Sequence, residues 1–298
     1  MTSGGKSKPF RFGMNMVIPD SRPVWVEKCR KAEGLGFDVI GVAEHLRMAP
    51  PFPALVLAAE ATSRVRLNTF VINTAFHNPA LLARDAAGTD LFTEGRLELG
   101  LGAGNVKSEF EVAGLEFPRA GKRVDHLEHT VKELKRHFAD EKHRPLTVQQ
   151  PGPPLLIAGR GDRLLTLAAE HADIIGFTGT AAVPDGSPLV AADAAEIEER
   201  ANFVREKLNG RDAEFNILSH FVEVGEDRRA GLEKVRGFLK DSHTVEQIAE
   251  LPTALVGTHE QIAEQLIAHR ERFGITYFTV LEQNMEPFAP VIELLRGR

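Results

Sequence analysis

The sequence predicts a single-domain α/β protein in which eight parallel strands close into a (β/α)8 TIM barrel. Short runs rich in β-branched residues alternate along the chain with amphipathic helices, as expected for repeated β/α units. Eight such runs are found, and most are apolar, which is typical of parallel strands covered on both faces. The chain has 298 residues, 43% of them hydrophobic, which is enough for one large core. An open doubly wound sheet is the alternative, usually with fewer strands.

The predicted strands are spaced so that a helix fits between most neighbours. They cover residues 10–18, 38–42, 65–73, 97–101, 155–158, 172–177, 215–224 and 275–281. Pro23 opens the first helix, where a missing backbone N–H costs nothing, and Gly34 and Gly36 close it. Asn78 and Pro79 form the cap and the first turn of the helix after the third strand.

Two later helices carry clear signals of their own. Residues 122–138 contain apolar side chains three and four positions apart, which form one stripe on a helix: Val124, Leu127, Val131, Leu134 and Phe138. Before the eighth strand, Thr258 and Gln261 have the spacing of a capping box, and Gly274 ends that helix.

Two segments interrupt the alternation of strands and helices. Residues 178–189 are rich in Gly, Pro and Ala and are predicted to form a mobile loop. Residues 241–253 are predicted to form a helix and an irregular link before the eighth strand.

The composition excludes several classes of function. The net charge is −6 and Lys and Arg are scattered, which argues against a nucleic-acid surface. Cys29 is the only cysteine, so an intrachain disulfide and a thiolate metal site are excluded, and the histidines show no metal-ligand spacing. No membrane span or signal peptide is found, so a cytoplasmic protein is expected. Residues 1–9 are expected to be a disordered segment and residues 10–298 the barrel domain.

In a barrel of this type the chemistry lies at the carboxyl ends of the strands. Glu44 and His45 directly follow the second strand, and an imidazole there can exchange a proton near neutral pH, or it can simply hydrogen-bond within the loop. Gly102 and Gly104 follow the fourth strand, where glycines let the backbone approach a flat ligand. A dinucleotide fingerprint would need glycine where Asn105 stands.

A third candidate site follows the fifth strand. Gly159, Arg160 and Gly161 lead directly into a helix that begins at Asp162. The free N–H groups of a helix N-terminus favour an anion, and Arg160 adds a full positive charge. The segment therefore suits a phosphate, although an ordinary turn between strand and helix is the alternative.

These segments together resemble the bacterial luciferase-like superfamily of flavin and deazaflavin enzymes. The most specific match is the Asp-x-x-(Ser/Thr)-x-Gly-Arg pattern from Asp90 to Arg96, continued by the glycines of the fourth strand and by Glu109-Phe110 and Gly114. Glu44-His45 matches the acid–His pair of the family, and the resemblance covers most of the chain.

The resemblance implies a fold, a coenzyme site and an assembly. It implies a cis peptide bond between Phe70 and Val71 in the third strand, beside the ring of the coenzyme. It implies that His45 transfers a proton and that Glu44 orients it. The remaining residues that it assigns to the coenzyme are Gly102, Ala103, Gly104 and Asn105 around the ring and Gly159, Arg160 and Gly161 around its phosphate. It also suggests a homodimer.

Two departures from the family pattern bear on the coenzyme. Luciferases have an Arg that contacts the FMN phosphate where this chain has Ala103, so the pattern is closer to the branch that uses the deazaflavin F420. In that branch the sugar-phosphate dehydrogenases have Glu where this chain has Asn105, which argues against that substrate. The sequence thus predicts an F420-dependent oxidoreductase acting on a small organic substrate that the sequence does not identify. An FMNH2-dependent monooxygenase served by a separate reductase, or a non-catalytic coenzyme-binding protein, are the alternatives.

Overall fold

The computed structural model describes residues 8–181, 190–240 and 242–298, and these form a closed barrel. Its sheet has the order β3-β2-β1-β13-β10-β7-β6-β5-β4, every pair in it is parallel, and β3 also pairs with β5. That last pairing closes the ring and excludes an open sheet. The strands are β1 (Arg11–Met16), β2 (Val39–Val42), β3 (Arg66–Thr69) with β4 (Ile72–Asn73), β5 (Leu97–Gly102), β6 (Leu155–Gly159), β7 (Ile174–Phe177), β10 (Glu214–Ser219) and β13 (Ile275–Leu281).

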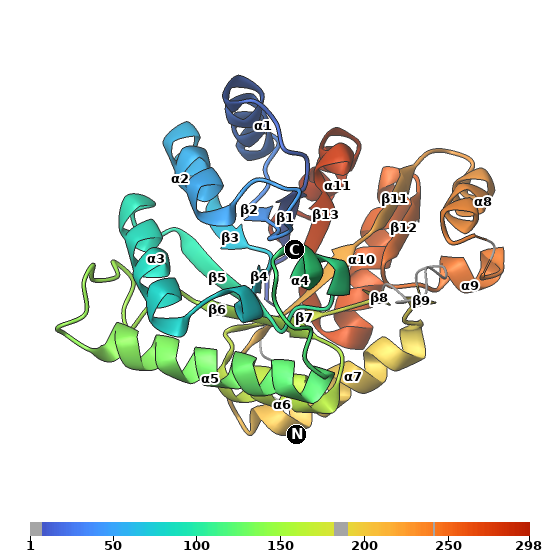
Figure 1. The fold of residues 1–298 in the computed structure, drawn as a ribbon. Helices are drawn as coiled ribbons and strands as arrows, with labels where there is room; N and C mark the ends of the chain where they lie inside the picture. Colours follow the sequence, from blue (N-terminus) through green and yellow to red (C-terminus); the bar gives the residue numbers. More distant parts are fainter. Residues whose placement is uncertain (1–7, 182–189, 241) are drawn as a thin grey trace.

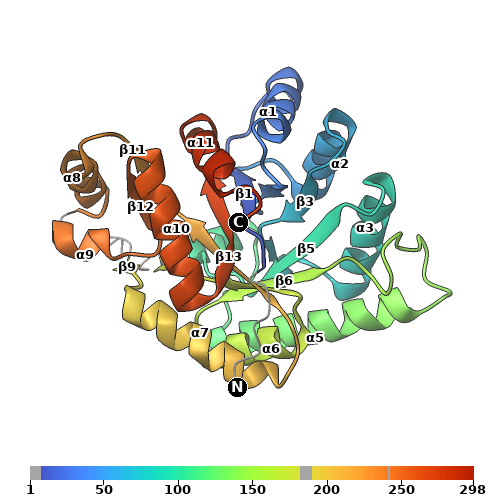
Figure 2. The same ribbon diagram turned by 180° about the vertical axis from the view of Figure 1, so that it is seen from behind.

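Helices surround the barrel, as Figures 1 and 2 show from opposite sides. The outer helices are α1 (Arg22–Gly34), α2 (Pro51–Ala61), α3 (Pro79–Phe92), α5 (Ala120–Ala139), α6 (Asp162–His171), α7 (Ala194–Leu208), α10 (His259–Phe273) and α11 (Met285–Leu295). The predicted signals are confirmed: Asn78 caps α3, Thr258 and Gln261 form a reciprocal capping box on α10, and Gly274 ends α10 with a φ of 75°. None of the helices in the described residues is long and apolar enough to cross a membrane.

The third barrel strand is interrupted, because the predicted strand 65–73 forms the two short strands β3 and β4. Asn68 pairs with Glu98 and Ile72 with Leu101, so this strand has one more residue than β5 between the two matched positions. The extra residue makes a bulge, and the peptide bond between Phe70 and Val71 within it is cis, as the family resemblance implied.

The side chain of Thr69 replaces the missing ladder bonds across this bulge. Its Oγ1 accepts a hydrogen bond from Gly100 N at 2.8 Å and donates one to Gly100 O at 2.9 Å. Gly100 is required at this position, because a Cβ on it would lie 1.9 Å from the carbonyl oxygen of Thr69.

The predicted strand 215–224 is also wrong as a single element. It breaks at His220 into β10, which belongs to the barrel, and β11 (Phe221–Val224), which pairs in parallel with β12 (Ala254–Gly257) in a separate sheet. Helices α8 (Arg228–Phe238) and α9 (Val245–Ala249) complete this unit, which lies to one side of the barrel (Figure 1). Its apolar cluster is separate from the barrel core and consists of Ala191, Leu232, Val235, Leu239, Val245, Ile248, Leu251, Ala254 and Val256.

Several other predicted segments differ in detail. The helix predicted within residues 241–253 is confirmed by α9, and the link after it leads into β12. Sequence reasoning missed β12 because four residues give too short a pattern to recognise. The predicted loop 178–189 begins with β8 (Thr180–Ala181), which pairs with β9 (Val190–Ala191), and residues 182–189 lie outside the described residues. Residues 1–7 of the predicted disordered segment also lie outside them.

The amino end of the barrel is filled by a buried ionic cluster. Glu98 accepts hydrogen bonds from Arg11 at 2.6 Å and from Arg66 at 2.5 Å, and Arg11 also binds Glu214. The fully buried ring of Tyr277 lies 4.6 Å from the Arg11 guanidinium, and burial together with Glu98 raises the pKa of Tyr277 above its usual value. The interior of the barrel is therefore closed to a ligand at its amino end.

We predict that Gly100→Ala destabilises the barrel at its closure. The new methyl group would meet backbone, so the free energy of unfolding should fall by at least about 2 kcal/mol in urea denaturation. Gly34→Ala, at the end of α1 with no heavy atom within 4 Å of the new Cβ, is the matched control and should change stability by less than about 1 kcal/mol. Equal stabilities of the two variants would contradict this account of the closure.

A second prediction concerns acid stability. His269 packs 5.5 Å from the ring of Phe273 and 6.2 Å from that of Phe278, and burial lowers its pKa to about 4. Because the unfolded imidazole takes up a proton at higher pH, the stabilisation is complete above about pH 6.5 and is lost as the pH falls towards 4. Between pH 7 and 5 the wild type should lose about 2 kcal/mol more than His269→Phe. His129→Phe, at an exposed position, is the control, and parallel curves for His269→Phe and the wild type would refute the prediction.

Candidate functional site

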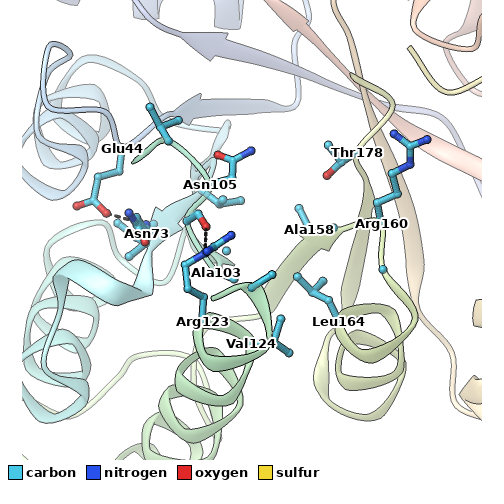
Figure 3. A pocket seen from close by; sticks show the side chains of 18 of the residues that line it. Glu44, Asn73, Ala103, Asn105, Arg123, Val124, Ala158, Arg160, Leu164 and Thr178 are labelled. Atoms are coloured by element: carbon cyan, nitrogen blue, oxygen red, sulfur yellow. Dashed lines mark hydrogen bonds between the residues drawn. The ribbon is translucent and has the colours of Figure 1, made fainter. Parts of the chain in front are cut away.

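A cavity of about 710 Å³ opens at the carboxyl ends of β2 to β7. Every residue that the sequence assigned to the site lines it: Glu44, His45, Phe70, Val71, Gly102, Ala103, Gly104, Asn105, Gly159, Arg160 and Gly161. Three further lining residues lie in segments that the sequence had marked without giving them a role: Asn73 in the third strand, Glu109 in the family pattern and Thr178 at the start of the predicted loop. No sequence signal marked Arg123 or Leu164 as site residues. Figure 3 shows Ala103, Asn105 and Arg123 on one side of this cavity and Ala158, Leu164 and Thr178 on the other.

The bulge between β3 and β4 and the glycines of β5 build one wall together. A Cβ on Gly102 would lie 2.7 Å from the Val71 side chain. Gly104 has a φ of 73°, and a Cβ on it would lie 2.2 Å from Asn73 Oδ1. Backbone therefore lies directly against the bulge here, and the wall is free of large side chains from β5.

Glu44 supports this wall instead of contacting His45. Its Oε2 accepts a hydrogen bond from Asn73 N at 2.7 Å, and its Oε1 lies 2.8 Å from His77 Nε2. The expected role of Glu44 in orienting His45 is therefore wrong for this structure. The acid–His adjacency in sequence misled the interpretation, because neighbouring residues after a strand point in different directions.

His45 is paired with Glu109 from a different element. Glu109 lies on α4 (Lys107–Val112), and its Oε1 is 2.9 Å from His45 Nδ1. The same oxygen accepts a hydrogen bond from Leu46 N at 3.2 Å. The only sequence signal for Glu109 was its place in the Glu-Phe pair beyond the glycines, which did not indicate a partner.

Aromatic packing fixes the short helix that carries Glu109. Phe110, which is 1% exposed, lies 5.0 Å from the ring of Phe76 and 5.0 Å from that of Phe117. This contact holds α4 against the segment after β4 and the loop before α5, so the position of Glu109 is set by buried apolar surface.

Arg160 is already neutralised by a carboxylate. Its guanidinium forms a two-point ion pair with Glu196 in the first turn of α7. Arg200, also on α7, binds Asp162 at the start of α6. Two ion pairs therefore hold α7 against the turn after β6: α7 contributes the carboxylate of Glu196 to one and the guanidinium of Arg200 to the other.

Arg123 is a different kind of cation. Its Nε donates to Gly104 O at 2.8 Å, another of its nitrogens donates to Pro118 O, and its guanidinium lies 4.2 Å from the ring centre of Phe117. No carboxylate pairs with it among the described residues. Burial lowers the pKa of Arg123, because a partly desolvated charge is held without a counter-charge. An anion in the cavity would supply that counter-charge.

No metal centre accompanies these groups in the part of the chain that the structure describes. Nowhere there do three or more His, Cys, Asp or Glu side chains come together in a way that could hold an ion.

Known proteins similar to this chain include both deazaflavin and flavin enzymes. A model of the luciferase-like monooxygenase family matches residues 22–277. An F420-dependent glucose-6-phosphate dehydrogenase from Kribbella flavida is 28% identical over 290 residues, which cover 90% of this chain and 84% of that protein. The oxygenase component of the flavin-dependent trigonelline monooxygenase from Acinetobacter baylyi is 32% identical over 152 residues, and the match spans 45% of this chain and only 42% of that protein.

Solved structures share the fold along nearly the whole chain. The monooxygenase RslO1 from Streptomyces bottropensis has a TM-score of 0.75 at 19% identity, covering 96% of this chain and 98% of its own. An F420-dependent secondary alcohol dehydrogenase has a TM-score of 0.72 at 19% identity, covering 97% and 100%. At this identity the likeness establishes the fold alone.

The two hydrogen bonds of Glu44 give a prediction about the wall. Glu44→Ala leaves the buried Asn73 N–H without its acceptor, so the free energy of unfolding in urea should fall by about 1–3 kcal/mol. Glu44→Gln keeps an oxygen acceptor of the same length and should stay within about 1 kcal/mol of the wild type. If Glu44→Ala were as stable as the wild type, Glu44 would not support the wall.

Proposed function

The chain belongs to the luciferase-like monooxygenase family, and from this premise we propose that it is an F420-dependent oxidoreductase. It moves a hydride between the deazaflavin and a small organic substrate. The observation that carries the proposal is that one cavity joins the bulged wall, the glycine backbone, the His45 imidazole and the uncompensated Arg123 guanidinium. The family supplies the coenzyme class, and these side chains support its binding and use.

The wall formed by Val71, Gly102 and Gly104 suits a flat ring system. Backbone at Gly102 and Gly104 leaves room for a planar ligand to approach closely, and Val71 offers an apolar surface beneath it. When bound, F420 supplies or accepts the hydride at C5, since carbon at that position favours two-electron transfer. The protein has to orient the ring, exclude water and handle one proton.

Arg123 is better suited than Arg160 to the anionic part of the coenzyme. Arg160 shares its charge with Glu196, and Asp162 at the start of α6 is paired with Arg200, so these two ion pairs leave no net positive charge at this turn. Arg123 has only carbonyl partners and an aromatic ring, so an anion there gains a full electrostatic interaction. The backbone N–H groups at Gly161 and the start of α6 add a partial positive charge from the opposite side of the cavity.

His45 is the group proposed to transfer the proton. It lines the cavity beside the bulge, and its side chain is 40% exposed, so a ligand can reach the ring. Acid–base help of this kind contributes about 10² to 10⁴ in rate. Removing the imidazole should therefore lower turnover far more than coenzyme affinity.

Two observations favour F420 over FMN. The F420-dependent relative matches along 90% of this chain, whereas the flavin-dependent oxygenase matches along 45%. Ala103 also has no charge to offer a phosphate beside the glycines. The second candidate is a monooxygenase that uses reduced FMN, and it is favoured by the 32% identity to the trigonelline enzyme.

Fluorescence titration of the purified protein with F420, FMN and, under nitrogen, FMNH2 separates these candidates. We expect F420 to bind with a micromolar or lower Kd and both flavin forms to bind at least tenfold more weakly. Arg123→Gln should weaken F420 binding about 10- to 100-fold and leave a deazaflavin without the phosphate tail unaffected. Arg119→Gln, an exposed residue that does not line the cavity, is the control. Tighter binding of FMNH2 would favour the monooxygenase, and binding of none of the three would refute both.

A further inference from the structure

We propose that Glu109 is a positioning residue for His45: it fixes the proton on Nδ1 and leaves Nε2 as the nitrogen that meets the ligand. This inference rests on the proposed function in one respect, which is that the ligand meeting Nε2 is the substrate or the coenzyme. The tautomer itself is inferred from the contacts of Glu109 with His45 and Leu46.

An ionised carboxylate accepts hydrogen bonds and donates none. At 2.9 Å from Glu109 Oε1, His45 Nδ1 must therefore be the donor. A neutral imidazole has one N–H, so its Nε2 then carries the lone pair and can accept a proton. Among the described residues Nε2 has no hydrogen-bond partner, which leaves it free for a ligand in the cavity that His45 lines.

One oxygen of Glu109 fixes the position of both the His45 ring and the neighbouring backbone. Glu109 Oε1 also accepts from Leu46 N, so the side chain of His45 and the next peptide unit are tied to the same atom. The Glu109 side chain is only 16% exposed, and hydrogen bonds to a charged group are stronger where water is limited. Glu44 takes no part, because both its oxygens are bound to Asn73 N and His77 Nε2.

The structure holds Glu109 in place without relying on the ligand. Phe110, the next residue, is buried between Phe76 and Phe117. Phe117 in turn packs on Arg123, the cation proposed to contact the anionic part of the coenzyme. The imidazole and that guanidinium are thereby fixed relative to each other through α4 and its aromatic anchor.

The test reads the tautomer of His45 directly by ¹⁵N NMR of the full chain labelled at the histidine rings, at neutral to alkaline pH without coenzyme. The chain has eleven histidines, and the signal missing from His45→Ala identifies His45. We expect the wild type to carry the proton on Nδ1. In Glu109→Gln, whose amide can also donate, the population should shift by at least about twofold towards the Nε2–H form.

Glu111→Gln is the matched control. It lies on the same helix two residues away, is exposed, and its ion pair with Lys107 does not reach His45. Its His45 signals should equal those of the wild type, and circular dichroism checks that all variants are folded. A wild-type Nε2–H tautomer, or the same tautomer in Glu109→Gln as in the wild type, would overturn the proposal.

A second readout separates the dyad from coenzyme binding. In fluorescence titration with F420, the Kd of Glu109→Gln should stay within about twofold of the wild type, because the Glu109 carboxylate contacts His45 and Leu46 N. A changed tautomer in a protein that binds no coenzyme would refute the proposed function and support the dyad. Normal coenzyme binding with an unchanged tautomer would refute the dyad alone.

Discussion

The closure of the barrel between Thr69 and Gly100 is the contact on which the rest of the structure depends. The interrupted strand has one residue too many for β5, and the hydroxyl of Thr69 takes over the two backbone bonds that the bulge removes. The bulge between β3 and β4 lies at the carboxyl end of the barrel, and its residues Phe70 and Val71 line the cavity. The barrel closure and the cavity wall therefore depend on the same bulge. Gly100 and Gly102 of β5 leave the space that this bulge needs.

The charges around the cavity differ in how completely they are matched. Glu44, Glu109 and Arg160 each bind a protein side chain, which is His77, His45 and Glu196 respectively. Their positions are therefore set before any ligand binds. Arg123 is held only by carbonyls and a ring. A site with its orienting groups satisfied and one cation unsatisfied is preorganised for an anionic ligand, because little rearrangement is needed on binding.

The sequence was sufficient for features that depend on local patterns or on a family motif. The positions of the eight barrel strands, the helix caps and part of the cavity lining fall in this group, since glycine spacing and periodicity act over short distances. Partners from distant elements could not be predicted. Glu109 meets His45 from 64 positions away and Glu196 meets Arg160 from 36, and no local rule specifies such contacts. Strand β12 was missed because its four residues give too short a pattern, and no local signal marks the departure of its neighbour β11 from the barrel.

The departure of β11 from the barrel places a small two-stranded sheet beside it, and Val222 and Leu255 of this sheet still pack into the barrel core. The unit of β11, α8, α9 and β12 has its own small apolar cluster and a sheet of only two strands. Two strands with a small core have little stability of their own, so we expect this unit to open more often than the barrel opens. Its amide hydrogens should then exchange with solvent through local openings, whereas those of β5 and β6 should exchange only when the whole barrel unfolds. Sequence change in this unit is correspondingly less constrained by the closure of the barrel.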